Sequence, residues 1–174
     1  MTDLTLRRAE PGDAAGLALL GGATFFTAFA HDHPGDALVQ HVAAEHSQDY
    51  YRKVLADPGA AVWLLETELK TAVGYAMMAA PQVDCATGLD DLELKRLYLL
   101  GPWQKGGWGA RLVDALEREA RARGATRLLL CVYTANLAAQ RFYARLGFAD
   151  TGHGQRFMVG DVAFDDRIWA KPLT

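Results

Sequence analysis

The sequence predicts an α/β fold with a mixed β-sheet, and two patterns support this prediction. A strand, an amphipathic helix and an apolar strand follow one another between residues 92 and 132, which is typical of two parallel strands joined by a crossover helix. Residues 61–66 and 72–78 have the pattern of two strands around a polar turn, which predicts an antiparallel hairpin. A sheet that contains both units is mixed.

Length and composition indicate one globular domain. The chain has 174 residues, of which 51% are hydrophobic and 22% charged, as in an ordinary soluble domain. We therefore expect residues 1–174 to form a single domain. The net charge of −3 does not favour nucleic-acid binding, because domains that bind nucleic acid usually carry a basic face.

Cysteine content and the N-terminus predict a location. The two cysteines have no CxxC spacing, which suits a reducing compartment. The N-terminus lacks the basic and then apolar pattern of a signal peptide, and the chain has no unbroken run of about 18 apolar residues. These features predict a cytoplasmic protein without a membrane segment.

The first half of the chain predicts a strand and several helices before the hairpin. Residues 4–8 form the strand, and Pro11-Gly12-Asp13 offers a turn and an N-cap for an Ala/Leu-rich helix. Gly21-Gly22 weakens that helix near its middle, since each glycine costs about 1 kcal/mol relative to alanine. Residues 36–56 predict one or two more helices, which Asp57-Pro58-Gly59 ends.

The second half predicts an alternation of strands and helices. The expected elements are a strand at 92–99, a helix at 107–123, a strand at 126–132, a helix at 137–146 and two terminal strands. The first of these helices places apolar residues at steps of four on one face, namely Trp108, Leu112, Leu116 and Ala120. That face is expected to pack on the sheet.

A glycine-rich loop at residues 102–109 connects the strand at 92–99 to the next helix. Glycines let the backbone approach a ligand closely, and the N–H groups at a helix start favour an anion. The loop therefore predicts a pyrophosphate cradle, with a merely flexible turn as the alternative. It has neither the Gly-Lys-Ser/Thr ending of a Walker loop nor the GxGxxG pattern of a dinucleotide site.

The strand at 92–99 changes the phase of its apolar residues. Leu92 and Leu94 occupy even positions, whereas Leu97 and Leu99 occupy odd ones. Because strand side chains alternate between faces, the change predicts one extra residue, a β-bulge, near Lys95-Arg96. A bulge would splay this strand from its parallel neighbour and open a cleft. The alternative is a regular strand that is buried on both faces.

The last predicted helix has recognisable ends. Asn136 can cap its start, and Gly147 fits the left-handed position after its end. Phe142 and Leu146 are four residues apart, so we expect both to face the core. A buried position in the core would account for Tyr143 without any functional role.

These segments together resemble the GNAT superfamily of N-acetyltransferases. The family's Gln/Arg-x-x-Gly-x-Gly/Ala motif is similar to residues 104–109, and its Asn-x-x-Ala-x-x-x-Tyr pattern is similar to residues 136–143. The Leu-Gly-Phe ending at 146–148 matches too. The resemblance implies a mostly antiparallel sheet of about six to seven strands with a splayed parallel pair and helices on both faces. The N-terminal region is loosely similar to the bacterial spermidine/spermine acetyltransferase-like subgroup.

The resemblance also implies roles for matching residues. Tyr143 would protonate the departing thiolate, since a phenol and a thiol have similar basicity. The splayed strand would hydrogen-bond the pantetheine arm of acetyl-CoA, and one of its amides would polarise the thioester carbonyl. Backbone N–H groups of the loop would hold the pyrophosphate. The implied cofactor-binding residues are Leu97, Tyr98, Leu99, Gln104, Lys105, Gly106, Gly107, Trp108, Gly109, Ala110 and Asn136.

Glu93 is the candidate general base, because the amine that attacks the thioester must lose a proton. It lies 11 residues before Gln104, which resembles the branch of the superfamily with a catalytic glutamate. Flanking leucines would raise its pKa by desolvation. The alternative is an ion pair with Lys95 or Arg96 on an exposed strand face.

The implied reaction transfers an acetyl group from acetyl-CoA to a primary amine of a small, cationic substrate by direct attack in a ternary complex. A polyamine is one acceptor among small amines, amino acids, drugs and protein N-termini. An acidic rim would steer a cation, and its predicted members are Asp84, Asp90, Asp91, Glu93, Asp161, Asp165 and Asp166. The oligomeric state is left open, with a homodimer as one alternative because dimers are common in the superfamily.

Two other functions and several single residues complete the prediction. The rival functions are a non-catalytic acyl-CoA-binding or sensing module and a nucleotide-binding interaction domain. The run His31-Asp32-His33 has no third ligand at a suitable spacing, so we expect no metal. Cys131 lies in an apolar strand and is expected to be a small core residue rather than a nucleophile. Trp103 and Trp108 are expected to pack beside the loop.

Overall fold

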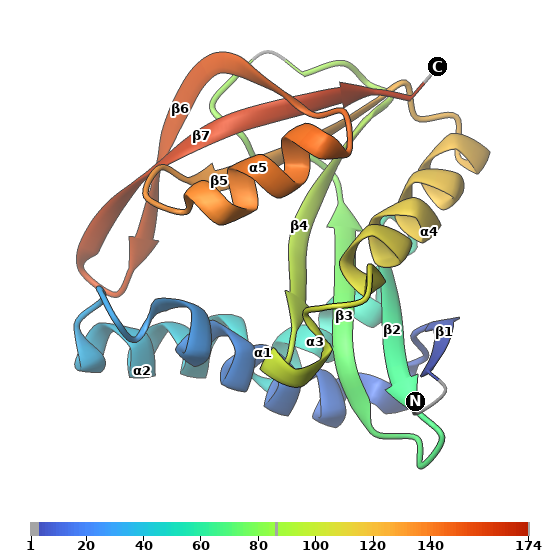
Figure 1. Ribbon diagram of the computed structural model, residues 1–174, viewed down its shortest axis with the longest axis vertical. Helices are drawn as coiled ribbons and strands as arrows, with labels where there is room; N and C mark the ends of the chain where they lie inside the picture. The colour runs from blue at the N-terminus through green and yellow to red at the C-terminus, as the bar shows by residue number, and fades with distance from the viewer. Residues whose placement is uncertain (1–3, 86, 174) are drawn as a thin grey trace.

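A computed structural model describes residues 4–85 and 87–173 (Figure 1). Its strands are β1 (Leu4–Arg8), β2 (Ala61–Thr67), β3 (Ala72–Ala79), β4 (Asp91–Leu99), β5 (Arg127–Tyr133), β6 (Ala149–Val159) and β7 (Val162–Pro172). Its helices are α1 (Ala14–Phe29), α2 (Gly35–Glu45), α3 (Gln48–Ala56), α4 (Trp108–Ala122) and α5 (Leu137–Arg145). Two short 3₁₀ turns, η1 (Pro11–Asp13) and η2 (Gly101–Trp103), precede α1 and α4.

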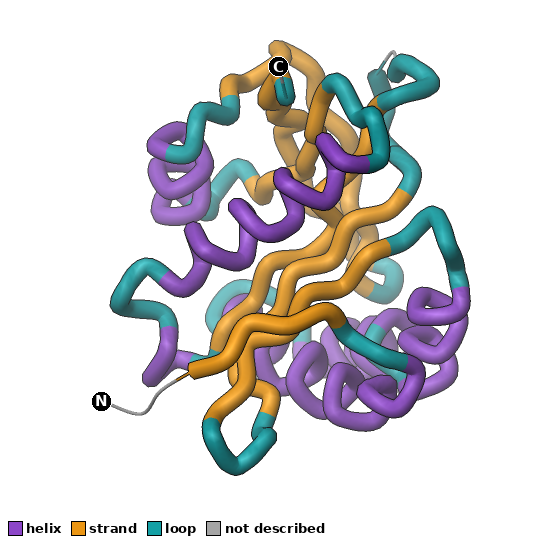
Figure 2. The backbone as a smooth tube through the Cα atoms, turned by 90° about the vertical axis from the view of Figure 1, so that its right-hand side faces the viewer, coloured by secondary structure: helices purple, strands orange, loops and turns teal. Residues whose placement is uncertain are grey.

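The seven strands form a sheet in the order β1-β2-β3-β4-β5-β7-β6. Neighbouring strands are antiparallel except β4 and β5, which pair in parallel. Helices cover both faces of the sheet (Figure 2). The predicted fold class is therefore confirmed, including the hairpin of β2 with β3 and the crossover through α4.

Each face of the sheet has its own apolar core. On one face, α4 and the C-terminal part of the chain pack over a cluster that contains Leu94, Leu112 and Leu128. On the other, α1 and α3 enclose a cluster with Leu17 and Tyr51 at its centre. The amphipathic pattern of α4 accounts for its position, because Leu112, with Leu116 and Ala120, faces the sheet.

Helix α1 has the predicted N-cap residue without its usual hydrogen bond. The Asp13 side chain makes no cap hydrogen bond to α1. Its carboxylate instead accepts two hydrogen bonds from Arg7, at 2.8 and 2.9 Å, and one from the backbone N–H of Glu10. Asp13 is therefore the N-cap residue of α1, as predicted, but its side chain makes no cap hydrogen bond because a guanidinium that comes from β1 binds the same carboxylate.

The sequence predicted no membrane segment, because the chain has no unbroken apolar run of sufficient length. One segment of the described chain nevertheless has the length and mean hydropathy of a membrane span. Residues Pro11–Phe29 have a mean hydropathy of 1.2 and are 39% buried. In the structure this segment is a helix of the packed core, with Leu17, Leu20 and Phe25 buried. A core helix of this kind satisfies the same criterion as a membrane segment.

Gly21 lets α1 lie directly against a buried polar cluster. A Cβ at this position would meet His46 Nδ1 and Tyr51 Oη at 2.4 Å and Tyr75 Oη at 3.1 Å. Gly16, on the same helix, has no atom within 4 Å of its Cβ position. Gly21 costs helix stability, as predicted, but its lack of a side chain is what allows α1 to pack closely against this cluster.

This contrast predicts opposite effects of two identical substitutions. Gly21→Ala should lower the free energy of unfolding by about 1–3 kcal/mol, because the methyl group forces its neighbours apart. Gly16→Ala should raise it by about 0.5–1 kcal/mol, because alanine favours the helix. Urea denaturation of both variants measures the difference. Equal stability of the two variants would contradict the close packing.

Candidate active site

The cleft of the molecule begins at a β-bulge in β4. Met77 of β3 pairs with Arg96 and Met78 with Leu94, so Lys95 is an extra residue. The predicted bulge near Lys95-Arg96 is confirmed. The parallel pairing of β4 with β5 ends at Leu94 and Leu130. Beyond that point β4 follows β3 and β5 follows β7, so the two strands separate.

A cavity of about 830 Å³ occupies this opening. Strands β4 and β5, the start of α4, helix α5 and the end of α1 contribute to its walls. Nine of the residues predicted from the sequence line it: Leu97, Tyr98, Leu99, Gln104, Gly107, Gly109, Ala110, Asn136 and Tyr143. The other predicted residues, Glu93, Lys105, Gly106 and Trp108, are not among its lining.

The start of α4 can bind an anion through its backbone. Gly106 and Gly107 have φ angles of 94° and 80°, a region that L side chains rarely adopt. The N–H of Arg111 donates to Gly107. The preceding three N–H groups, at residues 108–110, therefore lack an acceptor within the helix. They are directed out of the helix start, beside the cavity that Gly109 and Ala110 line.

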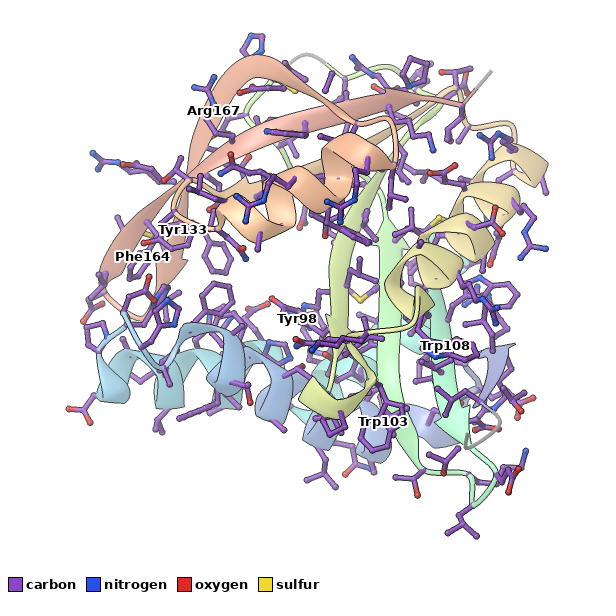
Figure 3. The ribbon with its side chains drawn as sticks, viewed as in Figure 1. Tyr98, Trp103, Trp108, Tyr133, Phe164 and Arg167 are labelled. Carbon is purple, nitrogen blue, oxygen red and sulfur yellow. The ribbon has the colours of Figure 1, made fainter. Side chains whose placement is uncertain are left out.

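The loop before α4 is tied to β4 and to the core. Gln104 Nε2 donates to the carbonyl oxygen of Leu99 at 3.1 Å. Trp103 and Trp108 pack against the core cluster, as expected, and Arg111 lies over the Trp108 ring at 4.5 Å. Figure 3 shows Trp103 and Trp108 beside this loop. The contacts hold the glycine segment at the mouth of the cleft.

Helix α5 brings Asn136 and Tyr143 to the cavity. Asn136 Oδ1 accepts from the N–H of Ala139 at 3.0 Å, so the predicted cap is confirmed. The Tyr143 ring packs edge-on against Phe142 and Phe148. No described residue forms a hydrogen bond to the Tyr143 hydroxyl. Burial, and next the Tyr98 phenol, raise the pKa of Tyr143, so its hydroxyl is a proton donor at neutral pH.

Glu93 already has partners. Its Oε2 lies 2.7 Å from Lys95 Nζ and accepts a hydrogen bond of 2.7 Å from the backbone N–H of Gln82. The alternative of an ion pair with Lys95 is therefore confirmed. The expected exposed face is wrong, because Glu93 is only 5% exposed. Since Glu93 precedes the bulge and Lys95 is the bulged residue, the local backbone brings the two together.

The predicted acidic rim is not one continuous feature, although three of its members, Asp84, Asp165 and Asp166, line a cavity of β6 and β7. Asp91 is paired with Arg127 and Glu93 with Lys95. Asp161 lies in the two-residue turn between β6 and β7. Asp166 is buried, with 8% exposure, and burial, and next Asp165, raise its pKa to about 6.

The sequence predicted Asp166 as a member of the acidic rim, whereas the structure buries it. The signal was present in the alternation of β7, where Phe164, Asp166 and Ile168 occupy one face. An acid between two apolar residues at this period faces inward.

Other residues differ from or extend the prediction. Cys131 is half-buried and lines the cavity rather than the core. Burial, and next the Glu93 charge, raise its pKa to about 12. His33 stacks on Phe164 with ring centres 3.6 Å apart, and its Nδ1 lies 2.6 Å from Asp32. Within residues 4–85 and 87–173, no group of three or more His, Cys, Asp or Glu could hold a metal ion.

Comparison with known proteins identifies the family. The model of the acetyltransferase (GNAT) family matches residues 25–148. An uncharacterized N-acetyltransferase of Mycobacterium tuberculosis is 33% identical over 162 residues, which cover 92% of this chain and 98% of the relative. The aminoglycoside N(6')-acetyltransferase type 1 of Serratia marcescens is 29% identical over 103 residues, 58% of this chain and 70% of the relative.

The same fold occurs in the PaiA N-acetyltransferase of Thermoplasma acidophilum, whose crystal structure contains coenzyme A. The two structures have a TM-score of 0.79 at 16% identity, over 98% of this chain and 99% of that one. The protein is thus of the class of acyl-CoA-dependent N-acetyltransferases. The chain belongs to the acetyltransferase (GNAT) family, as its two motifs predicted.

The Glu93–Lys95 pair generates a prediction about the general base. Glu93→Gln should destabilise the protein by about 1–3 kcal/mol, because Lys95 is left largely buried without its carboxylate. The double variant with Lys95→Met should recover that stability. We expect acetyl transfer by the double variant to stay within about tenfold of the wild type. A loss of about 10²-fold or more in a stable double variant would instead support Glu93 as the base.

Proposed function

We propose that this N-acetyltransferase moves the acetyl group of acetyl-CoA to the primary amine of a small, cationic substrate by direct attack in a ternary complex. One observation carries the proposal. A single cavity extends from the glycine start of α4, past the splayed part of β4, to Tyr143 and the end of α1. A cofactor and an acceptor can enter such a cavity together.

Two backbone segments provide the cofactor site. The unbonded N–H groups at residues 108–110, with the dipole of α4, suit the pyrophosphate. The edge of β4 from Lys95 to Leu99 has no pairing with β5, so its amides are free on that side to bind the pantetheine arm. One of them would polarise the thioester carbonyl.

The reaction then requires one bond exchange. The amine nitrogen attacks the thioester carbon, a C–N bond forms, and the C–S bond breaks. The attacking nitrogen loses one proton to water in the cleft as it becomes an amide. Tyr143 donates its phenolic proton to the departing thiolate, and the phenolate takes a proton back from solvent. Cys131 lines the same cavity, yet its raised pKa keeps it a thiol at neutral pH. This protonation state supports direct attack over an acetyl-cysteine intermediate.

The relative from Serratia is named for aminoglycosides, which are small cationic amines. This name supports a cationic acceptor, and spermidine belongs to the same chemical class. The polyamine, the homodimer, the cytoplasmic location and the single-domain extent of residues 1–174 stay predictions.

Release of free CoA thiol from acetyl-CoA tests the function, with spermidine and kanamycin among a panel of amines and an acceptor-free control. We expect amine-dependent release. Tyr143→Phe should lower kcat by about 10²-fold or more, as loss of a general acid does. Its thermal stability should stay unchanged, because the hydroxyl has no partner among the described residues.

Two negative results have different meanings. Stabilisation by acetyl-CoA without any thiol release would favour the non-catalytic acyl-CoA-binding module. Absence of both stabilisation and release would contradict the proposal.

The cofactor cradle predicts a difference between two equivalent glycines of α4. Gly107 and Gly124 flank the helix with φ angles of 80° and 82°, and neither has an atom within 4 Å of its Cβ position. Alanine should therefore cost about 1–2 kcal/mol at either site. Only Gly107→Ala should raise KM for acetyl-CoA, by about tenfold, which steady-state kinetics measures. An equal rise in Gly124→Ala would argue for a general loss of stability.

A further inference from the structure

The face of the sheet that is turned toward α1 and α2 holds a carboxylate that the reaction above does not use. We propose that Asp166 is the group that binds the ammonium of the acceptor, on a face of the sheet that also carries aromatic rings. The inference rests on the proposed transfer to an amine and names which part of the protein recognises that amine.

Strand register determines where Asp166 points. It pairs with Tyr133 of β5 on one side and with Gln155 of β6 on the other. Directly paired residues of antiparallel strands project to the same face, so these three side chains share one face of the sheet. Phe164 and Cys131 lie on that face too, each two residues from a member of this row.

Asp166 is both buried and unpartnered. It is 92% buried, the complement of its 8% exposure, and no hydrogen bond or ion pair joins its carboxylate to any described residue. A buried carboxylate without a partner is destabilising, so its presence requires an explanation such as a catalytic role or a bound ion. A bound ammonium would supply the missing hydrogen bonds and the missing positive charge.

No described cation forms an ion pair with Asp166. Arg156 and Arg167 line a cavity of β6 and β7 together with it, but Arg167 is paired with Asp150 at 3.0 Å. Arg156 is exposed, and because its neighbour Gln155 pairs with Asp166, the Arg156 side chain projects from the opposite face of the sheet. His33, which stacks on Phe164, holds its Nδ1 2.6 Å from Asp32. An acceptor ammonium would therefore be the first cation paired with the Asp166 carboxylate.

Aromatic rings lie on the same face of the sheet and at the end of α1. Tyr133 and Phe164 have ring centres 5.7 Å apart, and Phe29 at the end of α1 lies 6.4 Å from Tyr133. Figure 3 shows Tyr133 on β5 and Phe164 on β7, with Tyr98 across from them on β4. Ring faces attract an ammonium and cover its carbon chain, as in other sites that bind alkylammonium groups.

Asp166 also lies between two cavities. Its neighbours Tyr133 and Cys131 line the cleft between β4 and β5. Asp166 itself lines a second cavity of about 470 Å³, which is formed mainly by β6 and β7. An acceptor with a second amine can therefore extend away from the reaction centre, and this arrangement fits a diamine or a larger polyamine better than a monoamine.

Asp166→Asn tests the proposal, and Asp165→Asn is its matched control on the same strand. Burial raises the pKa of Asp166 to about 6, above its unfolded value. Its contribution to stability is thus present below the unfolded pKa and is lost as the pH rises to about 6. We expect the Tm of Asp166→Asn to exceed the wild-type Tm at pH 8 and the difference to vanish near pH 4. Asp165→Asn should show no such dependence.

Binding is measured with spermidine and kanamycin as probe amines at pH 7.5. Asp166→Asn should raise KM for the amine by about tenfold or more and leave KM for acetyl-CoA unchanged, whereas Asp165→Asn should change neither. In the wild type, both amines should raise the Tm, and this shift should be absent in Asp166→Asn.

Three results would overturn the proposal. They are an unchanged amine KM in Asp166→Asn, an equal change in Asp165→Asn, and the absence of amine stabilisation in the wild type. Failure of the proposed function is distinct, because it would appear as no thiol release by the wild type with any amine.

Discussion

The early end of the pairing between β4 and β5 is the constraint on which the other features of the site depend. These strands share only a four-residue parallel register, from Asp91 with Arg127 to Leu94 with Leu130. An ion pair between Asp91 and Arg127 stabilises its first step, and the Arg127 hydrogen bond lowers the pKa of the Asp91 carboxyl. The bulge at Lys95 then lets β4 stay with β3 while β5 continues beside β7. If β4 and β5 stayed paired along their full length, the backbone hydrogen bonds between them would close the cleft.

A buried polar cluster holds the bulged segment in place. Arg96 donates to Tyr51 Oη at 3.0 Å, and the same oxygen lies 2.7 Å from Tyr75 Oη and 3.0 Å from His46 Nδ1. Burial, and next the Arg96 charge, lower the pKa of His46 to about 3, so the imidazole is neutral and does not repel the guanidinium. His46 directly follows α2, and the other three residues come from α3, β3 and β4. Gly21 lets α1 pack directly against them. The cluster thus joins these helices and strands to the point where β4 and β5 separate.

The two faces of the sheet contribute different chemistry. On the face of α4 and α5 the cleft offers backbone N–H groups and the Tyr143 phenol, which suit an anionic cofactor and its leaving thiolate. The face of α1 and α2 carries the aromatic rings of Phe29, Tyr133 and Phe164, with Asp166 in the adjoining cavity of β6 and β7, and these groups would suit a cation. The two partners of a transfer reaction can thus approach the splayed strand from opposite sides. An unpaired buried carboxylate is a cost to stability that a functional site tolerates.

The sequence by itself determined the features that depend on neighbouring residues. The phase change from Leu94 to Leu97 predicted the bulge, and Asn136 and Gly147 marked the ends of α5, because side-chain alternation and helix caps are local properties. Only the tertiary structure decided the partners of charged residues. The Asp13 carboxylate binds Arg7 rather than the first turn of α1, Glu93 accepts a hydrogen bond from the N–H of Gln82, and Asp166 is buried beside Tyr133 of the neighbouring strand, which lies 33 positions earlier in the chain. Charge pairing arises between segments that are distant in sequence, so no local pattern specifies it.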